Sequence, residues 1–356
     1  MVSLLERKLI VVTGKGGVGK STVASALGLA AAQRGLRTIV VQLGAQHQLL
    51  DLFAADEMGL NKPGRAMHAD DNEHSRREHR PDRHDGEEIE LQEGLLWTVS
   101  IDPDRALGEW LQTLTGRISA RLLASSSTFQ YFAAAAPGAK ELVSMVKLRE
   151  LCEGRGETKS GSGDSSRDRR GRPAYDLVVL DAPASGHALA MLRSPQTFSA
   201  ILRVGPLAEQ AQALRELLED AQRSAYVAVT HASEMAVTET LELEEGLRRD
   251  LDRDLDAVIV NGTMPRRFTR EELGRISAAA ANQSQGAGAA VTSSAVQMAR
   301  TVNDRARVQL AQIARLRRQR FAEGSPPVVL TVPFAFVQVF DLGAVRRIGD
   351  RLGGKI

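Results

Sequence analysis

A glycine-rich stretch near the start of the chain has the spacing of a phosphate-binding loop. It follows an apolar run and opens a helical pattern, so strand, loop and helix come in the order that such a loop requires. Backbone N–H groups freed by glycine can turn toward one anion, Lys20 can reach the β- and γ-phosphates, and Ser21 can offer its hydroxyl to Mg²⁺. The stretch predicts contact with ATP and Mg²⁺ along its whole length, which reads Gly14, Lys15, Gly16, Gly17, Val18, Gly19, Lys20, Ser21 and Thr22.

A second lysine, Lys15, stands directly after the first glycine of this stretch, where a loop of this type tolerates almost any residue. A cation at the mouth of the loop can reach a phosphate held by another subunit and supply charge there during phosphoryl transfer. Lys15 therefore suggests a nucleotide held between two subunits. The alternative is a solvated lysine on a surface loop.

A buried strand that ends in a carboxylate predicts the metal side of the same site. Residues 177 to 180 are apolar throughout, as in a strand that is covered on both faces, and Asp181 follows them. A carboxylate there can hold Mg²⁺ together with the hydroxyl of Ser21. Lys15, Lys20 and Asp181 are therefore the candidate catalytic residues.

Several stretches resemble the ArsA/Get3 family, the ATPases that drive the arsenical pump or target tail-anchored proteins. Residues 15–22 are similar to the family's deviant phosphate loop, residues 182–187 to its second switch, and residues 131–142 to its actinobacterial members. The resemblance implies a Mg²⁺-dependent ATPase of the P-loop type. It also implies that Asn261 and Pro333 flank the adenine.

The same resemblance implies a dimer that opens and closes with its nucleotide, formed by two copies or by this chain and a paralogous ATPase. It further implies a hydrophobic client or a membrane protein as partner. The apolar residues of the segment 107–151 could form a client groove, but amphipathic helices more often bury their apolar face internally. A partition or division ATPase is a third reading, which the short basic end at residues 346–356 supports poorly.

One position departs from the family. Its first switch carries an aspartate that positions the attacking water, and Gly44 stands at the matching position here. The sequence therefore predicts ATP binding with slow hydrolysis; Gln46, Gln48 and Asp51 are candidates to orient water instead, and solvated switch residues are the alternative. The competing function is a nucleotide-responsive binding module that does not hydrolyse ATP, the inactive half of a heterodimer.

Alternation of strand and helix patterns predicts an α/β fold: a doubly wound, mostly parallel sheet with helices on both faces and a helical insertion at residues 103–153. We expect one domain over residues 1–356, with disordered charged insertions at 61–88 and 154–173. A polar stretch from Asn282 to Ser294 is expected to link two helices. The predicted strands are Lys8 to Thr13, Thr38 to Leu43, Leu96 to Ile101, Leu177 to Asp181, Tyr226 to Thr230, Ala257 to Asn261 and Val328 to Val332.

Composition restricts the remaining function classes. The formal net charge of +2 gives no electrostatic argument for nucleic acid as a partner. Cys152 is the single cysteine, which excludes a disulfide within the chain and a thiolate metal site within one subunit. Four histidines between residues 68 and 84 are better explained by a charged loop than by a metal site. No run of about 18 apolar residues is present, so we expect a cytoplasmic protein, with peripheral membrane contact as a possibility.

Overall fold

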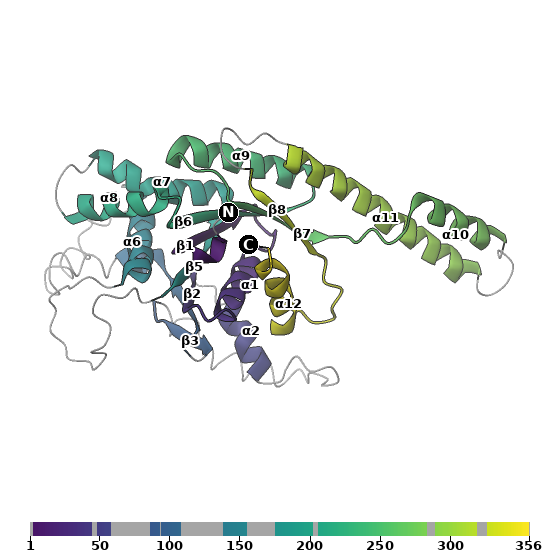
Figure 1. The fold of residues 1–356 in the computed structure, drawn as a ribbon, viewed down its shortest axis with the longest axis horizontal. Helices are drawn as coiled ribbons and strands as arrows, with labels where there is room; N and C mark the ends of the chain where they lie inside the picture. Colours follow the sequence, from purple (N-terminus) through teal and green to yellow (C-terminus); the bar gives the residue numbers. More distant parts are fainter. Residues whose placement is uncertain are drawn as a thin grey trace.

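An eight-stranded sheet forms the centre of the computed structural model, with the order β3-β4-β2-β5-β1-β6-β7-β8 (Figure 1). The structure describes residues 3–44, 48–57, 86–92, 94–107, 138–154, 175–201, 206–282, 289–318 and 326–355. The strands are β1 (Leu9–Gly14), β2 (Thr38–Leu43), β3 (Ile89–Gln92), β4 (Leu96–Ile101), β5 (Leu177–Ala184), β6 (Ser224–His231), β7 (Ala257–Thr263) and β8 (Val328–Pro333). All pair in parallel except β3, which runs antiparallel to β4. The predicted α/β fold with a mostly parallel sheet is therefore confirmed.

Strand β3 was not among the predicted strands. This strand has only four residues, lies at the edge of the sheet, and alternates between half-buried and exposed side chains. Its sequence, Ile-Glu-Leu-Gln, directly follows the charged stretch that was expected to be disordered. The seven predicted strands are all present, although β5 runs on to Ala184 and β7 to Thr263.

Helices cover both faces of the sheet (Figure 1). One face carries α1 (Lys20–Ala32), α2 (Gln48–Glu57) and α12 (Leu342–Gly353), and a short 3₁₀ helix, η1 (Leu4–Glu6), packs into the same apolar cluster. The other face carries α6 (Ala139–Glu153), α7 (Ser185–Ile201), α8 (Pro206–Glu219) and α9 (Glu234–Leu251). Neighbouring residues of one strand serve opposite faces: in β1, Leu9 packs under the second group and Ile10 under the first. Double coverage explains why the strands are almost continuously apolar.

Strand β1 lies between β5 and β6. After β1 the chain passes to β2, on the β5 side of β1, and after β5 it crosses over to β6 on the opposite side. Open α/β sheets bind ligands in the crevice at the carboxyl ends of such strands. This topology places the glycine-rich stretch after β1 at the expected position for a ligand.

A helical hairpin extends away from the sheet (Figure 1). It consists of α10 (Arg270–Asn282) and α11 (Ala289–Arg318). Of this hairpin, only the C-terminal end of α11 enters the core, where Ile313 and Leu316 are buried. The polar stretch expected to link two helices is helical again from Ala289, since alanine-rich sequence there favours helix over the loop that its polar residues suggested.

The helical insertion expected at 103–153 is described only in part. Residues 103–107 are helical, and α6 buries its apolar side chains, including Leu142, Met145 and Leu148, in the core of the domain. These residues pack internally and do not form an exposed groove. Residues 108–137 and nearly all of both charged insertions, with their histidines, lie outside the described residues. Within the part of the chain that is described, no helix is both long and apolar enough to cross a membrane.

Candidate functional site

The glycine-rich loop lies between β1 and α1 and is tightly enclosed at both ends. Gly14 has φ +144°, and a Cβ there would lie 2.0 Å from the carbonyl oxygen of Val229 in β6. Gly19 has φ +92°, and a Cβ there would lie 2.4 Å from Nδ2 of Asn261. Side chains at either position would push the loop away from the neighbouring strands. The two glycines therefore allow the loop to pack directly against the neighbouring strands at the carboxyl end of β1.

The two lysines of the loop differ in their surroundings. Lys20, in the first turn of α1, donates from Nζ to the carbonyl oxygen of Lys15 at 3.2 Å. Burial lowers the pKa of Lys20, while the carboxylates of Asp181 and Glu239 oppose this shift. An anion bound at the loop would oppose it further, because it would stabilise the charged ammonium group.

Lys15 faces an acidic residue of its own chain. Its Nζ lies 2.9 Å from Oε2 of Glu239 on α9, and the hydroxyl of Ser185, the first residue of α7, donates to the other oxygen of Glu239. These hydrogen bonds, that of Ser185 above all, lower the pKa of Glu239, so it is ionised at neutral pH. Glu239 thus connects the loop lysine to the segment that resembles the second switch. Glu239 could not be identified from the sequence, because α9 carries several acidic residues and their spacing does not single out one of them.

Asp181 and Ser21, the two expected metal ligands, lie within hydrogen-bonding distance of each other. Asp181 is buried in β5, and its carboxylate accepts hydrogen bonds from the side chains of Ser21 and Gln42. Burial raises the pKa of Asp181 and these hydrogen bonds oppose the shift. A hydroxyl and a carboxylate are ligands that suit Mg²⁺, which usually takes one or two protein groups and completes its shell with phosphate oxygens and water. The donor set therefore fits the ion that the sequence implied.

Asn261 and Pro333, expected beside the adenine, stand at the ends of the paired strands β7 and β8. Nδ2 of Asn261 donates to the carbonyl oxygen of Val18 at 2.9 Å, so in this structure the amide holds the phosphate loop. Next to exposed Pro333, the rings of Phe334 and Phe336 meet edge to face with their centroids 4.9 Å apart.

Gly44 begins the segment that resembles the family's first switch. Its φ of +96° belongs to a region that residues with side chains rarely adopt. Its N–H donates to the carbonyl oxygen of Ile101 at 3.0 Å, and its own carbonyl oxygen accepts from the hydroxyl of Ser100. The backbone conformation at this position therefore favours glycine. Asp51 is exposed on the first turn of α2, which Gln48 begins; Gln46 and its neighbour His47 lie outside the described residues.

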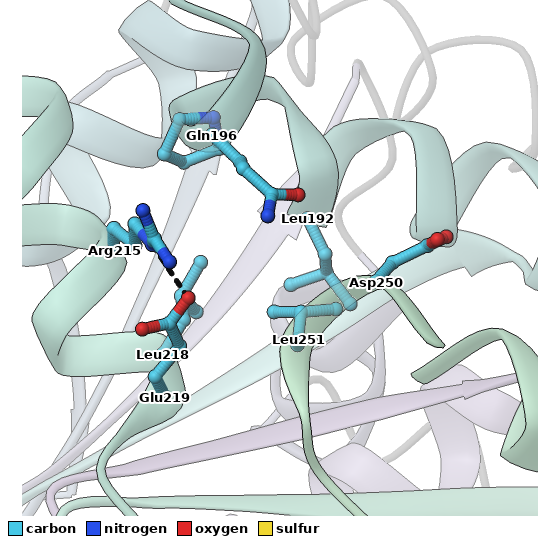
Figure 2. Close-up of a pocket in the computed structure, with 8 residues that line it drawn as sticks. Leu192, Gln196, Arg215, Leu218, Glu219, Asp250 and Leu251 are labelled. Carbon is cyan, nitrogen blue, oxygen red and sulfur yellow. Dashed lines mark hydrogen bonds and ion pairs between the residues drawn. The ribbon is translucent and has the colours of Figure 1, made fainter. Parts of the chain in front are cut away.

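A shallow depression between α7, α8 and α9 lies apart from this site (Figure 2). Even with the adjoining open solvent included, its volume is only about 190 Å³. Arg215 and Glu219 form an ion pair on one side of it, with their atoms 2.6 Å apart, and Leu192 and Leu251 contribute apolar surface. Small-molecule pockets usually occupy about 300–1,000 Å³, so the depression is too small for a nucleotide.

Comparison with known proteins agrees with the fold. The family model of anion-transporting ATPases matches residues 7–208. ATPase BagA of Mycobacterium tuberculosis is 25% identical over 269 residues, which cover 75% of this chain and 68% of that protein. ATPase GET3C of Arabidopsis thaliana is 23% identical over 312 residues, covering 74% and 69% respectively. A putative arsenical pump-driving ATPase of Halobacterium salinarum is 23% identical over 282 residues, covering 74% of this chain and 37% of its own. Since the family match spans more than half of the sequence and the fold is of the P-loop type, the chain belongs to the ArsA/Get3 family of anion-transporting ATPases.

Proposed function

We propose that this protein binds MgATP at the loop between β1 and α1 and hydrolyses it slowly. The observation that carries this proposal is the convergence of Lys20, Ser21 and Asp181 at the carboxyl ends of β1 and β5. Lys20 would bind the β- and γ-phosphates, and the backbone N–H groups of residues 14–22 would surround them. Asn261 would leave its bond with the loop to face the adenine, with Pro333 on the other side.

Ser21 and Asp181 would hold the Mg²⁺ ion. When bound, the ion neutralises negative charge on the phosphates and orients them. The protein's own contribution is positioning: α1 directs its N-terminal end and Lys20 at the phosphates, and the buried carboxylate of Asp181 sets the place of the ion. Lys15, once separated from Glu239, would supply positive charge to a nucleotide held by the second subunit.

Slow turnover follows from Gly44, which has no side chain to orient water. A second function is supported by the same residue: a nucleotide-responsive module that binds ATP without hydrolysing it and pairs with an active paralogue. The positive φ of Gly44 supports this second function, because a first switch adapted to that conformation would have to change shape before it could accept an aspartate.

The partners we propose follow from family membership. The protein would act as a homodimer or as a heterodimer with a paralogous ATPase, and its opening and closing would be coupled to a hydrophobic client or a membrane protein. We place it in the cytoplasm, with peripheral contact at a membrane, and expect no nucleic acid as a partner.

The first experiment measures phosphate release by the purified protein with MgATP, beside Lys20→Ala, with ATP affinity measured in parallel. Turnover that Lys20→Ala abolishes would establish an ATPase. ATP binding without turnover would favour the nucleotide-responsive module. No ATP binding by the unmodified protein would refute both.

A second experiment restores the absent carboxylate with Gly44→Asp. Because any side chain at φ +96° is strained, by about 1–3 kcal/mol, the matched control is Gly44→Asn, which has nearly the same shape without the charge. Activity gained in Gly44→Asp alone would identify the missing carboxylate as the limit on turnover. An equal change in both variants would point to the backbone instead.

A further inference from the structure

Gln42 is a buried polar side chain in the middle of the sheet. It belongs to β2, between the apolar Val41 and Leu43, and only 3% of it is exposed. Burying an amide is unfavourable unless its polar atoms are paired. A glutamine at this position therefore calls for a function that an apolar residue could not serve.

The pairing partner is the candidate metal ligand. Gln42 lies directly opposite Asp181 in the parallel pairing of β2 with β5, and its Nε2 donates to Oδ2 of Asp181 at 3.3 Å. The hydroxyl of Ser21 bonds the same carboxylate. Asp181 is therefore held from two sides, by a residue of α1 that would itself bind the metal and by an amide from the neighbouring strand.

The backbone around Gln42 is fixed as well. On its other side β2 pairs with β4, where Ser100 stands opposite Gln42 and bonds the carbonyl oxygen of Gly44. Gln42 thus lies in a strand paired on both sides. The sheet therefore fixes the backbone from which the side-chain amide of Gln42 reaches Asp181.

We propose that Gln42 is a positioning residue for the Mg²⁺ site: by donating to Oδ2, it fixes the rotamer of Asp181 so that the carboxylate faces the ion. This inference rests on the proposed function. An amide suits the task because it donates a hydrogen bond while leaving the carboxylate negative. A lysine would neutralise the carboxylate, and a glutamate would repel it. Without a donor at this position, the carboxylate would be free to turn toward Lys20 or away from the ion.

Replacing a residue that is hydrogen-bonded to a metal ligand typically lowers metal affinity by about 10- to 100-fold. Gln42→Met keeps the length and the apolar stem of the side chain and removes the donor. We expect it to weaken metal binding about tenfold, while binding of nucleotide without metal stays within about twofold. In steady state, the Mg²⁺ concentration for half-maximal turnover should rise more than the maximal rate falls.

The test uses the full-length protein and Mn²⁺ as a spectroscopic substitute for Mg²⁺. Free Mn²⁺ is measured by electron paramagnetic resonance in the presence of ADP, and ADP binding is measured separately in excess chelator. Thr98→Val is the matched control: Thr98 is equally buried in β4, and its hydroxyl donates to the carbonyl oxygen of Val40 at 3.2 Å, away from the carboxylate. Gln42→Asn keeps the amide but shortens its reach, and it carries the test if Gln42→Met does not fold.

The expected result is weaker Mn²⁺ binding in both Gln42 variants, unchanged ADP binding in chelator, and a Thr98→Val protein that matches the wild type. Wild-type Mn²⁺ affinity in the Gln42 variants would overturn the inference and leave the proposed function intact. Equal losses of metal and metal-free nucleotide binding would also overturn it, since they would reduce Gln42 to a support of the fold. A wild-type protein that binds neither ADP nor Mn²⁺ would overturn the proposed function, and this inference with it.

Discussion

Replacing Glu239 by glutamine should tighten ATP binding. In the structure the carboxylate of Glu239 pairs with Lys15 and also lies close enough to Lys20 to influence its pKa. An incoming phosphate would compete with this carboxylate for the same positive charges. Glutamine keeps the shape of the side chain and the acceptor for the hydroxyl of Ser185, so Glu239→Gln removes little besides the negative charge.

The size of the effect follows from distance and exposure. Nζ of Lys15 and Oε2 of Glu239 are 2.9 Å apart, but the two side chains are 37% and 28% exposed, so solvent screens the pair. Pairs of this kind contribute about 0.2–1 kcal/mol. Releasing the upper half of that range, about 0.5–1 kcal/mol, corresponds to ATP binding about two- to fivefold tighter. Because salt screens partly exposed charges, the gain should shrink at high ionic strength.

The assay is a titration with ATP and Mg²⁺ at low and high salt, by calorimetry or with a fluorescent analogue. Glu242→Gln, which makes the same charge change at an exposed position one turn along α9, is the control and should have no effect. In a Lys15→Ala background, Glu239→Gln should lose most of its effect. Unchanged or weaker ATP binding in Glu239→Gln would refute the competition. A gain of the same size without Lys15 would assign it to Lys20.

Three further predictions concern stability and reactivity. Gly349→Leu should lower the free energy of unfolding in urea by about 1–3 kcal/mol, because a Cβ at Gly349 would already lie 2.7 Å from the carbonyl oxygen of Ala26 where α12 meets α1. Gly343→Ala, in the first turn of α12, is the control that should be tolerated. Equal urea midpoints for Gly349→Leu and the wild type would contradict the prediction. Burial raises the pKa of Glu244 from 4.5 to about 7, so the native state holds more protons than the unfolded state in this window and stability should fall as pH rises from about 4.5 to about 7. Glu244→Gln should flatten that part of the urea-unfolding profile, and an unchanged slope would count against it. Burial also raises the pKa of the Cys152 thiol to about 12, so a thiol reagent at pH 8 should label the protein only as it unfolds; immediate labelling of the native state would disprove this.

The sequence predicted most of the sheet because its strands carry their own signal. Strands buried on both faces read as apolar runs, as in β1 and β5, whatever their neighbours are. The edge strand β3 was not predicted because its burial depends on one neighbour, β4, and its four residues include glutamate and glutamine. Local pattern identifies an element when the whole element is buried, and fails when only part of it is.

The site divides in the same way. The loop from Gly14 to Thr22 could be predicted because its chemistry depends on neighbours in the sequence. The partners of Lys15 and Asp181 could not, because Glu239 and Gln42 reach them only through the pairing of distant strands and helices. The backbone requirement at Gly44 was also hidden, since a glycine in the sequence does not reveal its φ.

The hydrogen bond from Asn261 to Val18 has a consequence for when the loop is assembled during synthesis of the protein. It joins residues 243 positions apart, and the ion pair of Lys15 with Glu239 spans nearly as much of the chain. When only β1 and α1 have emerged from the ribosome, the nascent chain contains every residue of the loop but can form neither of these two contacts. Contacts so distant in sequence form late, because the loop-closure entropy must be offset by the assembled sheet. The loop should therefore take its final place against the sheet during synthesis only after β7 has joined β6 and brought Asn261 to Val18.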